Sequence, residues 1–157
     1  KIEGFFETMS PARNIHLGDL ARRRGKSLWT RKAEERSLGA RWSQTLNIKA
    51  VSREVTVIEL SGGNQQKLVI AKSLVQEPGL IIFDEPTRGV DVGAIAEIHA
   101  LIERLADAGN AGVVISSYLP EVLALSDRIL VARQGKVVEE FSAEEADEKR
   151  IMYAAIH

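Results

Sequence analysis

The sequence contains no cysteine, which excludes disulfide bonds and metal sites built from thiolates. Aromatic residues make up only 5% of the 157 residues, and no apolar run approaches the roughly 18 residues that span a bilayer. The first ten residues, KIEGFFETMS, lack a signal-peptide pattern. Because 45% of the residues are hydrophobic, we expect a folded globular chain that resides in the cytoplasm.

The formal net charge of −1 hides an uneven distribution of charge along the chain. Residues 11–53 carry eleven basic side chains against three acidic ones, so this segment is +8 and the remainder is −9. A basic segment of this kind can serve a nucleic-acid or membrane surface. The alternative is a solvated helical face, which is favoured because Asp19, Glu34 and Glu35 are interleaved with the basic residues.

Residues 8–50 have the character of a helical region. Ser10 can cap a helix that has Pro11 at its first position, and Thr30 can cap a second helix that reaches about Leu46. No strand-like alternation of apolar and polar residues occurs in this region. We therefore expect two helices here.

From residue 60 onward the pattern changes to alternating helices and strands. The apolar runs Leu80–Phe83 and Val113–Ile115 predict parallel strands buried on both faces, and residues 92–108 between them predict an amphipathic helix. Gln134-Gly135 predicts a hairpin turn. Ser142 with Glu145 predicts a capping box for a final helix. The sequence thus predicts an α/β fold with a C-terminal hairpin and helix.

Two acidic residues, Asp84 and Glu85, end the first predicted strand. The carboxyl ends of parallel strands face the crevice where α/β folds bind ligands. An acid there can hold Mg²⁺ directly or through water, and Glu85 could orient or deprotonate a water molecule that attacks a γ-phosphate. The alternative is a surface turn, "DEPT", in which both acids merely cap the next element.

Ser61-Gly62-Gly63 opens a predicted helix. Two glycines let the backbone approach a ligand, and a helix N-terminus offers unpaired amides at the positive end of its dipole. An ordinary helix cap is the alternative for this motif taken alone. The sequence contains no G-x-x-x-x-G-K-[ST] loop, the pattern that cradles nucleotide phosphates. The motifs therefore indicate phosphate chemistry without a nucleotide cradle.

These motifs and their spacing resemble a known family. "LSGGNQQKLVIAKSL" resembles the signature motif of ATP-binding cassette (ABC) ATPases, and "LIIFDEP" resembles their Walker B strand with its catalytic glutamate. "RGVD", which ends at Asp91, is similar to their D-loop. The resemblance extends from about residue 10 to the C-terminus and is strongest to the second cassette of bacterial importers for ribose, galactosides and related monosaccharides.

The resemblance implies a fold and a site. In this family two cassettes pack head to tail, and each ATP lies between the P-loop of one cassette and the signature helix of the other. Ser61, Gly62 and Gly63 would then contact a nucleotide held by a partner cassette, and Gln65 and Asp91 are expected among the cofactor-binding residues. Asp84, through Mg²⁺, and Glu85 would serve the nucleotide bound by their own cassette. Residues 1–58 would form part of the permease-facing helical subdomain, and residues 59–157 would form the C-terminal part of the ATPase core.

The sequence departs from the family pattern at one position. The family has a switch histidine just after the second predicted strand, and here Ser117 takes its place. A serine can donate a hydrogen bond to a γ-phosphate, but it cannot carry charge or shuttle a proton as imidazole can. This substitution leaves open whether the cassette's own site hydrolyses ATP.

The resemblance also implies partners and a location. Lys1 is not a start methionine, so we expect a fragment of a longer cassette that is inactive without its N-terminal P-loop half. The complete cassette would use ATP and Mg²⁺ with a second cassette and a transmembrane sugar permease, at the cytoplasmic face of the membrane. We expect the isolated fragment to form homo-oligomers through a hydrophobic sheet edge.

Three other functions compete with this interpretation. A chromosome-maintenance type of ATPase would need long coiled-coil heptads beside the signature, and the sequence has none. A nucleic-acid-binding module could use the basic segment 11–53, but aromatic stacking platforms and known binding motifs are lacking, so we expect no nucleic-acid partner. The third alternative is an interaction fragment without catalytic activity.

Overall fold

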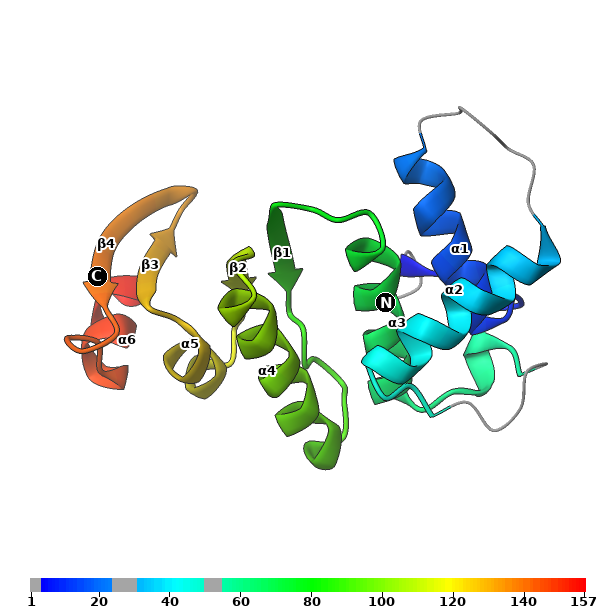
Figure 1. The fold of residues 1–157 in the computed structure, drawn as a ribbon. Helices are drawn as coiled ribbons and strands as arrows, with labels where there is room; N and C mark the ends of the chain where they lie inside the picture. The colour runs from blue at the N-terminus through cyan, green and yellow to red at the C-terminus, as the bar shows by residue number, and fades with distance from the viewer. Residues whose placement is uncertain (1–3, 24–30, 50–54) are drawn as a thin grey trace. The chain divides into compact units, whose positions relative to one another are not determined.

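The computed structural model describes residues 4–23, 31–49 and 55–157 (Figure 1). The chain divides into two compact units. Unit 1 comprises Lys1–Gly79 and Thr87–Leu101, and unit 2 comprises Leu80–Pro86 and Ile102–His157. Each unit is described by itself below. The predicted boundary between residues 1–58 and 59–157 refers to parts of a complete cassette and stays a prediction.

Unit 1 is built from helices. In chain order they are α1 (Pro11–Arg22), α2 (Lys32–Thr45), the short 3-10 helix η2 (Val57–Glu59), α3 (Gly62–Leu74) and the first part of α4 (Val92–Asp107). Ser10 caps α1 as predicted, since its hydroxyl accepts a hydrogen bond from the Arg13 N–H at 3.3 Å. The N-cap of α2 is Arg31, without a side-chain cap, and the predicted cap Thr30 lies outside the described residues.

Two glycines allow the helices of unit 1 to approach one another closely. A Cβ atom on Gly18 of α1 would lie 2.3 Å from the carbonyl oxygen of Lys72 in α3. A Cβ atom on Gly39 of α2 would lie 2.4 Å from the Cβ of Ala12 in α1. Real Cβ atoms essentially never approach other heavy atoms this closely, so these contacts require glycine.

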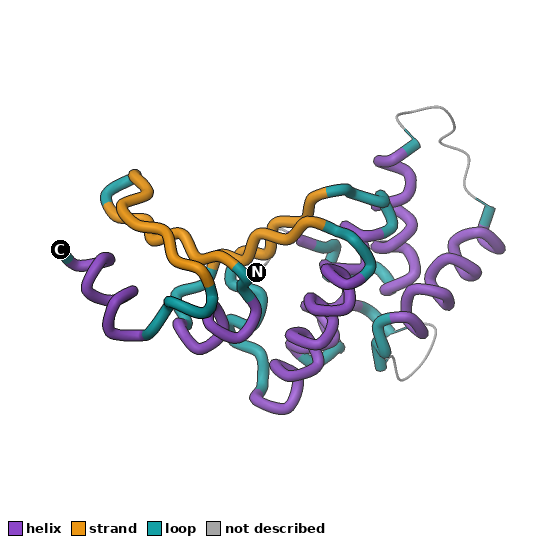
Figure 2. Tube along the Cα trace, turned by 60° about the vertical axis from the view of Figure 1, so that its left-hand side comes forward, coloured by secondary structure: helices purple, strands orange, loops and turns teal. Residues whose placement is uncertain are grey.

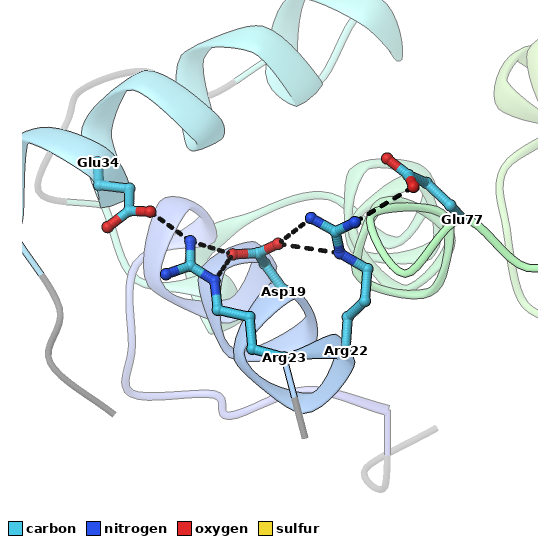
Figure 3. A network of polar contacts seen from close by, with 5 residues as sticks. All are labelled: Asp19, Arg22, Arg23, Glu34 and Glu77. Carbon is cyan, nitrogen blue, oxygen red and sulfur yellow. Dashed lines mark hydrogen bonds and ion pairs between the residues drawn. The ribbon is translucent and has the colours of Figure 1, made fainter. Parts of the chain in front are cut away.

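A network of ion pairs ties the helices of unit 1 together (Figure 3). Asp19, which is buried, accepts hydrogen bonds from Arg22 at 3.2 Å and from Arg23 at 2.8 Å. Arg22 also pairs with Glu77 beyond the end of α3, and Arg23 pairs with Glu34 of α2. The hydrogen bonds with Glu34 and Asp19 raise the pKa of Arg23. Since Asp19 holds both arginines, it links α1 to the other two helices.

Unit 2 contains the strands of the fold. β1 (Leu80–Asp84) and β2 (Ala111–Ile115) pair in parallel, and β3 (Arg128–Arg133) and β4 (Lys136–Ser142) form an antiparallel hairpin. The helices are the end of α4, α5 (Leu119–Leu125) and α6 (Glu148–Ile156). Figure 2 draws the chain as a tube in which the strands of unit 2 are orange and the helices are purple. The predicted α/β fold, with a helical region, a parallel pair, a hairpin and a final helix, is confirmed.

The hairpin confirms one local prediction, and the final helix corrects another. Gln134 and Gly135 have φ angles of 49° and 76°, the left-handed pair that a two-residue turn requires. The predicted capping box at Ser142 is wrong, because Ser142 is the last residue of β4 and its hydroxyl binds Glu145 in a turn. Asp147 caps α6 instead, accepting from the Arg150 N–H at 2.9 Å.

The burial of the parallel strands differs from the prediction. β1 alternates, with Ile81 and Phe83 buried but Leu80 and Ile82 exposed. In β2, Val113 and Ile115 are also exposed. A wholly apolar run predicts burial on both faces only if both faces are covered, and within unit 2 one face of this pair is open. The core of unit 2 instead includes Ile129, Val131, Phe141, Ile151 and Ala154, from the hairpin and α6.

None of the helices among the described residues is long and apolar enough to cross a membrane.

Candidate functional site

The predicted phosphate-binding turn lies in unit 1, at the start of α3. Ser61 is the N-cap residue, with extended backbone angles of −60° and 154°, and Gly62 and Gly63 are the first helical residues. The position of the cap is confirmed, but the Ser61 hydroxyl makes no capping bond to the backbone. It accepts instead from the side-chain amide of Asn64 at 2.9 Å. Ser61 is exposed, whereas Gly62 is half-buried and Gly63 is buried.

The two glycines let the start of α3 pack against the segment that contains Asp91. A Cβ atom on Gly63 would lie 2.6 Å from the Cβ of Ala94 in α4, and one on Gly62 would lie 3.3 Å from the Gly89 carbonyl oxygen. Asp91 itself caps α4, because its carboxylate accepts from the Ala94 N–H at 3.1 Å. The structure therefore brings Asp91 beside the turn Ser61-Gly62-Gly63, the signature turn.

Gln65 serves the local structure. Its side-chain amide donates to the carbonyl oxygens of Val57 at 3.2 Å and Leu60 at 3.1 Å. These bonds tie the first turn of α3 to η2, the segment that leads into the signature turn. The predicted contact of Gln65 with a nucleotide stays a prediction.

An ion pair that the sequence did not reveal supports the same helix. Lys67 lies one turn beyond Gly63, is buried, and pairs with Glu97 of α4. Its ammonium also donates to the Asn47 carbonyl oxygen at 3.3 Å. The hydrogen bond from Lys67, with the charge of Lys67 next, lowers the pKa of Glu97. α3 and α4 are therefore in contact at two successive turns of α3. Gly63 packs against Ala94, and Lys67 pairs with Glu97.

A further carboxylate is fixed just before the signature turn. Glu59 accepts hydrogen bonds from the Thr56 hydroxyl and the Thr56 N–H, each at 2.7 Å. These bonds, with the hydroxyl first, lower the pKa of Glu59. The reciprocal pattern is a capping box around η2. This capping box fixes the conformation of the segment that leads into Ser61.

The predicted carboxylate pair lies in unit 2, where β1 ends. Asp84 is the last residue of β1, is exposed, and stands opposite Ile115 in the parallel register. Glu85 follows with a φ of 47°, a left-handed conformation that is uncommon for residues other than glycine. Its N–H donates to the Ile115 carbonyl oxygen at 2.7 Å. This bond continues the strand pairing by one residue and turns the chain at Glu85.

Ser117 lies beside Glu85 in the same unit. The main-chain N–H of Ser117 donates to Oε1 of Glu85 at 3.0 Å, across 32 positions of sequence. The Ser117 side chain is exposed. The structure thus brings together Glu85 and the residue at the predicted switch position, and it does so through the backbone.

Asp84 meets the requirements of a magnesium ligand. Its carboxylate has no hydrogen bond or ion pair with any residue that the structure describes, and it stands at the carboxyl end of a parallel strand. No group of three or more histidine and carboxylate side chains gathers anywhere in residues 4–23, 31–49 and 55–157. Mg²⁺ is usually held by one or two carboxylates together with waters and substrate phosphates, so a single free carboxylate fits it.

The arrangement offers two sets of groups with different chemistry. Unit 1 presents a helix N-terminus with an exposed hydroxyl, which suits an anion. Unit 2 presents a free carboxylate beside a second carboxylate held by an amide, which suits a metal ion and a water nucleophile.

Comparison with known proteins identifies relatives of the chain. A family model described as "ABC transporter" matches residues 3–88. A protein from Rubrobacter xylanophilus described as "Ribose import ATP-binding protein RbsA 2" is 46% identical over 155 residues, which is 99% of this chain and 30% of that protein. A "Xylose import ATP-binding protein XylG" from Thermoanaerobacter pseudethanolicus is 52% identical over 115 residues, which is 73% of this chain and 23% of that protein.

Solved structures share the fold. An inward-facing metal-chelate type ABC transporter aligns with a TM-score of 0.80 at 21% identity, over 98% of this chain and 62% of that chain. A bacterial ABC transporter cassette described as dimeric aligns with a TM-score of 0.72 at 21% identity, over 88% of this chain and 59% of that chain. The chain therefore has part of the ABC cassette fold, and it spans about 30% of the length of the ribose import relative.

Proposed function

The chain belongs to the ABC transporter family, and from this premise we propose that it is part of an ATPase that drives sugar import. ATP binding and hydrolysis would be coupled to passage of a monosaccharide through a membrane permease. The names of the relatives from Rubrobacter and Thermoanaerobacter, ribose and xylose import ATP-binding proteins, support this proposal. Since the chain spans under a third of those proteins, the activity belongs to the complete protein.

One observation carries the catalytic part of the proposal, namely the position of Glu85. It follows Asp84 at the carboxyl end of β1, and its Oε1 is held by the Ser117 N–H at 3.0 Å. A carboxylate fixed through one oxygen keeps the other free to accept a proton from water. We assign Glu85 as the residue that orients and deprotonates the attacking water, and the Ser117 hydroxyl as a donor to the γ-phosphate.

Asp84 is the residue that would hold Mg²⁺, directly or through water. Bound Mg²⁺ neutralises charge that develops on the phosphates during phosphoryl transfer. The exposed carboxylate of Asp84 supports this role, because it is not engaged by another described residue.

The signature turn would serve a different nucleotide, held by a partner cassette. Ser61, Gly62 and Gly63 offer a hydroxyl and helix amides to its phosphates, and Asp91 lies beside them. Gln65 would complete this group from the next turn of α3. The related cassette that is described as dimeric supports an arrangement with two cassettes.

The proposal includes partners and a location. The complete protein would act with a second cassette and a transmembrane sugar permease, as a peripheral protein at the cytoplasmic face of the membrane. The 157 residues lack a G-x-x-x-x-G-K-[ST] loop, so ATP and Mg²⁺ would bind only when the P-loop half is supplied. The isolated chain would be inactive.

We also propose that the isolated chain self-associates, because the parallel strands of unit 2 expose apolar side chains. Leu80, Ile82, Val113 and Ile115 expose apolar side chains on the parallel strand pair of unit 2. Exposed apolar patches and strand edges recruit other chains. The isolated chain would therefore form a dimer or a larger oligomer.

A chimera tests the catalytic proposal. This chain would replace the aligned 155-residue segment of the ribose import relative from Rubrobacter xylanophilus, and ATP hydrolysis would be measured with its permease in vesicles. We expect hydrolysis that Glu85→Gln reduces at least about a hundredfold, because the water loses its base. Glu144→Gln, a change at an exposed glutamate in the turn after β4, is the matched control and should retain full activity. Equal rates for the chimera and Glu85→Gln would refute the assignment.

A further inference from the structure

The contact between Glu85 and Ser117 joins a side-chain carboxylate to a main-chain N–H. The donor is a main-chain N–H, so the bond does not depend on which side chain occupies position 117. The acceptor is a carboxylate on a residue with a φ of 47°, whose own N–H is bound to Ile115. Both ends of Glu85, backbone and side chain, are therefore tied to the segment that begins at the end of β2.

The turn that supplies this N–H is itself fixed by a side chain. The Ser116 hydroxyl accepts a hydrogen bond from the Tyr118 N–H at 3.0 Å. The Tyr118 carbonyl oxygen accepts in turn from the Glu121 N–H at 3.0 Å, in the first turn of α5. Only residues 116–118 separate β2 from α5, so the Ser116 bond sets the direction of the Ser117 N–H between them.

We propose that Ser116 is a positioning residue for the proposed hydrolysis. Its hydroxyl shapes the turn so that the Ser117 amide holds Oε1 of Glu85 and leaves Oε2 to face the attacking water. The inference rests on the function proposed above, since it assigns how the proposed base is held. It also separates two roles at position 117, with the amide serving Glu85 and the side chain left free for a phosphate.

The contact can be observed without any enzymatic activity. In the 157-residue chain, hydrogen exchange of the Ser117 amide would be followed by NMR. We expect protection that falls at least about tenfold in Glu85→Ala, because the acceptor is gone. Ser117→Ala should keep the protection of this amide, since the main-chain N–H remains. Glu144→Ala, at an exposed glutamate of unit 2, should leave it unchanged.

Ser116 is tested by the same measurement. Ser116→Ala should reduce protection of the Ser117 amide, and Ser116→Thr should restore it, because threonine retains a hydroxyl at the same place. Equal exchange of this amide in the unchanged chain, Glu85→Ala and Ser116→Ala would overturn the proposal. The Thr variant keeps the test valid even if Ser116→Ala disturbs the fold.

The role of Ser116 in hydrolysis is tested by steady-state kinetics of the chimera with the ribose import relative. Ser116→Ala should lower kcat about tenfold while KM changes less than twofold, and Ser116→Thr should recover the rate. An active chimera with the same kcat in Ser116→Ala would overturn the positioning role. A chimera that does not hydrolyse ATP would contradict the proposed function, and in that case the amide protection alone decides whether Ser116 positions the Ser117 amide that holds Glu85.

Discussion

Unit 1 and unit 2 bury their apolar residues to different degrees. Among the residues of unit 1 that the structure describes, the exposed large apolar side chains are Phe6, Ile58 and Val92. In unit 2 they include residues of all four strands and of α6, namely Leu80, Ile82, Val113, Ile115, Leu130, Val137, Val138, Met152, Tyr153 and Ile156. The helices of unit 1 cover one another, whereas the strands of unit 2 leave an apolar face open.

The buried polar groups of unit 1 include Asn14, Asp19 and Lys67, each of which has hydrogen-bond or ionic partners. They also include His16, whose two ring nitrogens have no hydrogen-bond partner among the described residues. The proposed catalytic carboxylates of unit 2 are at least partly exposed, and Glu85 is held by one amide. Unit 1 is therefore organised as a self-contained structural body that presents the signature turn. Unit 2 presents Asp84 and Glu85 on a body whose strands expose apolar side chains.

The largest expected effect comes from Gly18, at the contact of α1 with α3. Gly18→Ala would place a Cβ 2.3 Å from the Lys72 carbonyl oxygen, so the helices must separate. We expect a loss of about 2–3 kcal/mol in the stability of unit 1, in spite of the higher helix propensity of alanine. Hydrogen exchange should show lost protection in α1 and α3 while β3 and β4 keep theirs. The control is Gly79→Ala, whose Cβ would meet no atom within 4 Å. Equal effects of the two changes would contradict the account.

The next effect concerns the ion pair between Lys67 and Glu97. Glu97→Gln leaves the buried ammonium of Lys67 without its charged partner. Because the Glu97 side chain is 47% exposed, we expect a modest loss of about 1–2 kcal/mol in unit 1. A double-mutant cycle with Lys67→Met measures the coupling, and Glu103→Gln at an exposed site of α4 is the control. Additive effects of the two changes would show that the pair contributes nothing.

The open face of unit 2 gives a third prediction. Ile82 and Val113 are partners in the parallel register and both are exposed. Ile82→Lys should weaken self-association of the chain about tenfold, because burial of this side chain contributes about 1 kcal/mol or more. Ile58→Lys, at an equally exposed apolar residue of unit 1, should leave association unchanged. Sedimentation equilibrium at tens of micromolar distinguishes these outcomes, and a monomeric unchanged chain would refute self-association.

The smallest effect is a dependence of the stability of unit 1 on pH. The pKa values of Glu97 and Glu59 lie below the ordinary value of 4.5, because Lys67 and Thr56 stabilise their ionised forms. A carboxylate with a lowered folded-state pKa adds stability above its unfolded pKa and loses it as the pH falls through the folded pKa. Unfolding of unit 1 should therefore become easier below about pH 4.5. Glu97→Gln should flatten this dependence, and an unchanged pH profile in that variant would contradict the assignment.

Local features of the fold could be predicted from the sequence because neighbouring residues determine them. Ser10 with Pro11 sets the start of α1, and Gln134 with Gly135 sets the hairpin turn, each within a few residues. Asp84 could be placed at a strand end because the preceding run is wholly apolar. The capping box at Ser142 failed because its pattern also fits a turn that ends a strand.

Contacts between distant segments could not be predicted in the same way. Glu85 and Ser117 are 32 positions apart, and Lys67 and Glu97 are 30 apart. No periodicity in the sequence indicates that the two residues of either pair lie in contact. The open face of β1 was also missed, because an apolar run does not show which of its faces is covered. The roles of the two motifs therefore came from the family resemblance, and the way in which Glu85 is held came from the structure.

The central claim is that the chain carries two half-sites and no nucleotide cradle. Calorimetric titration of the 157-residue chain with Mg-ATP tests it most directly. The account predicts no detectable heat of binding at millimolar ATP, for the unchanged chain and for Ser61→Ala and Glu85→Gln alike. Saturable binding that is lost in Ser61→Ala and kept in Glu85→Gln would contradict it, because the signature turn would then hold the nucleotide without a partner.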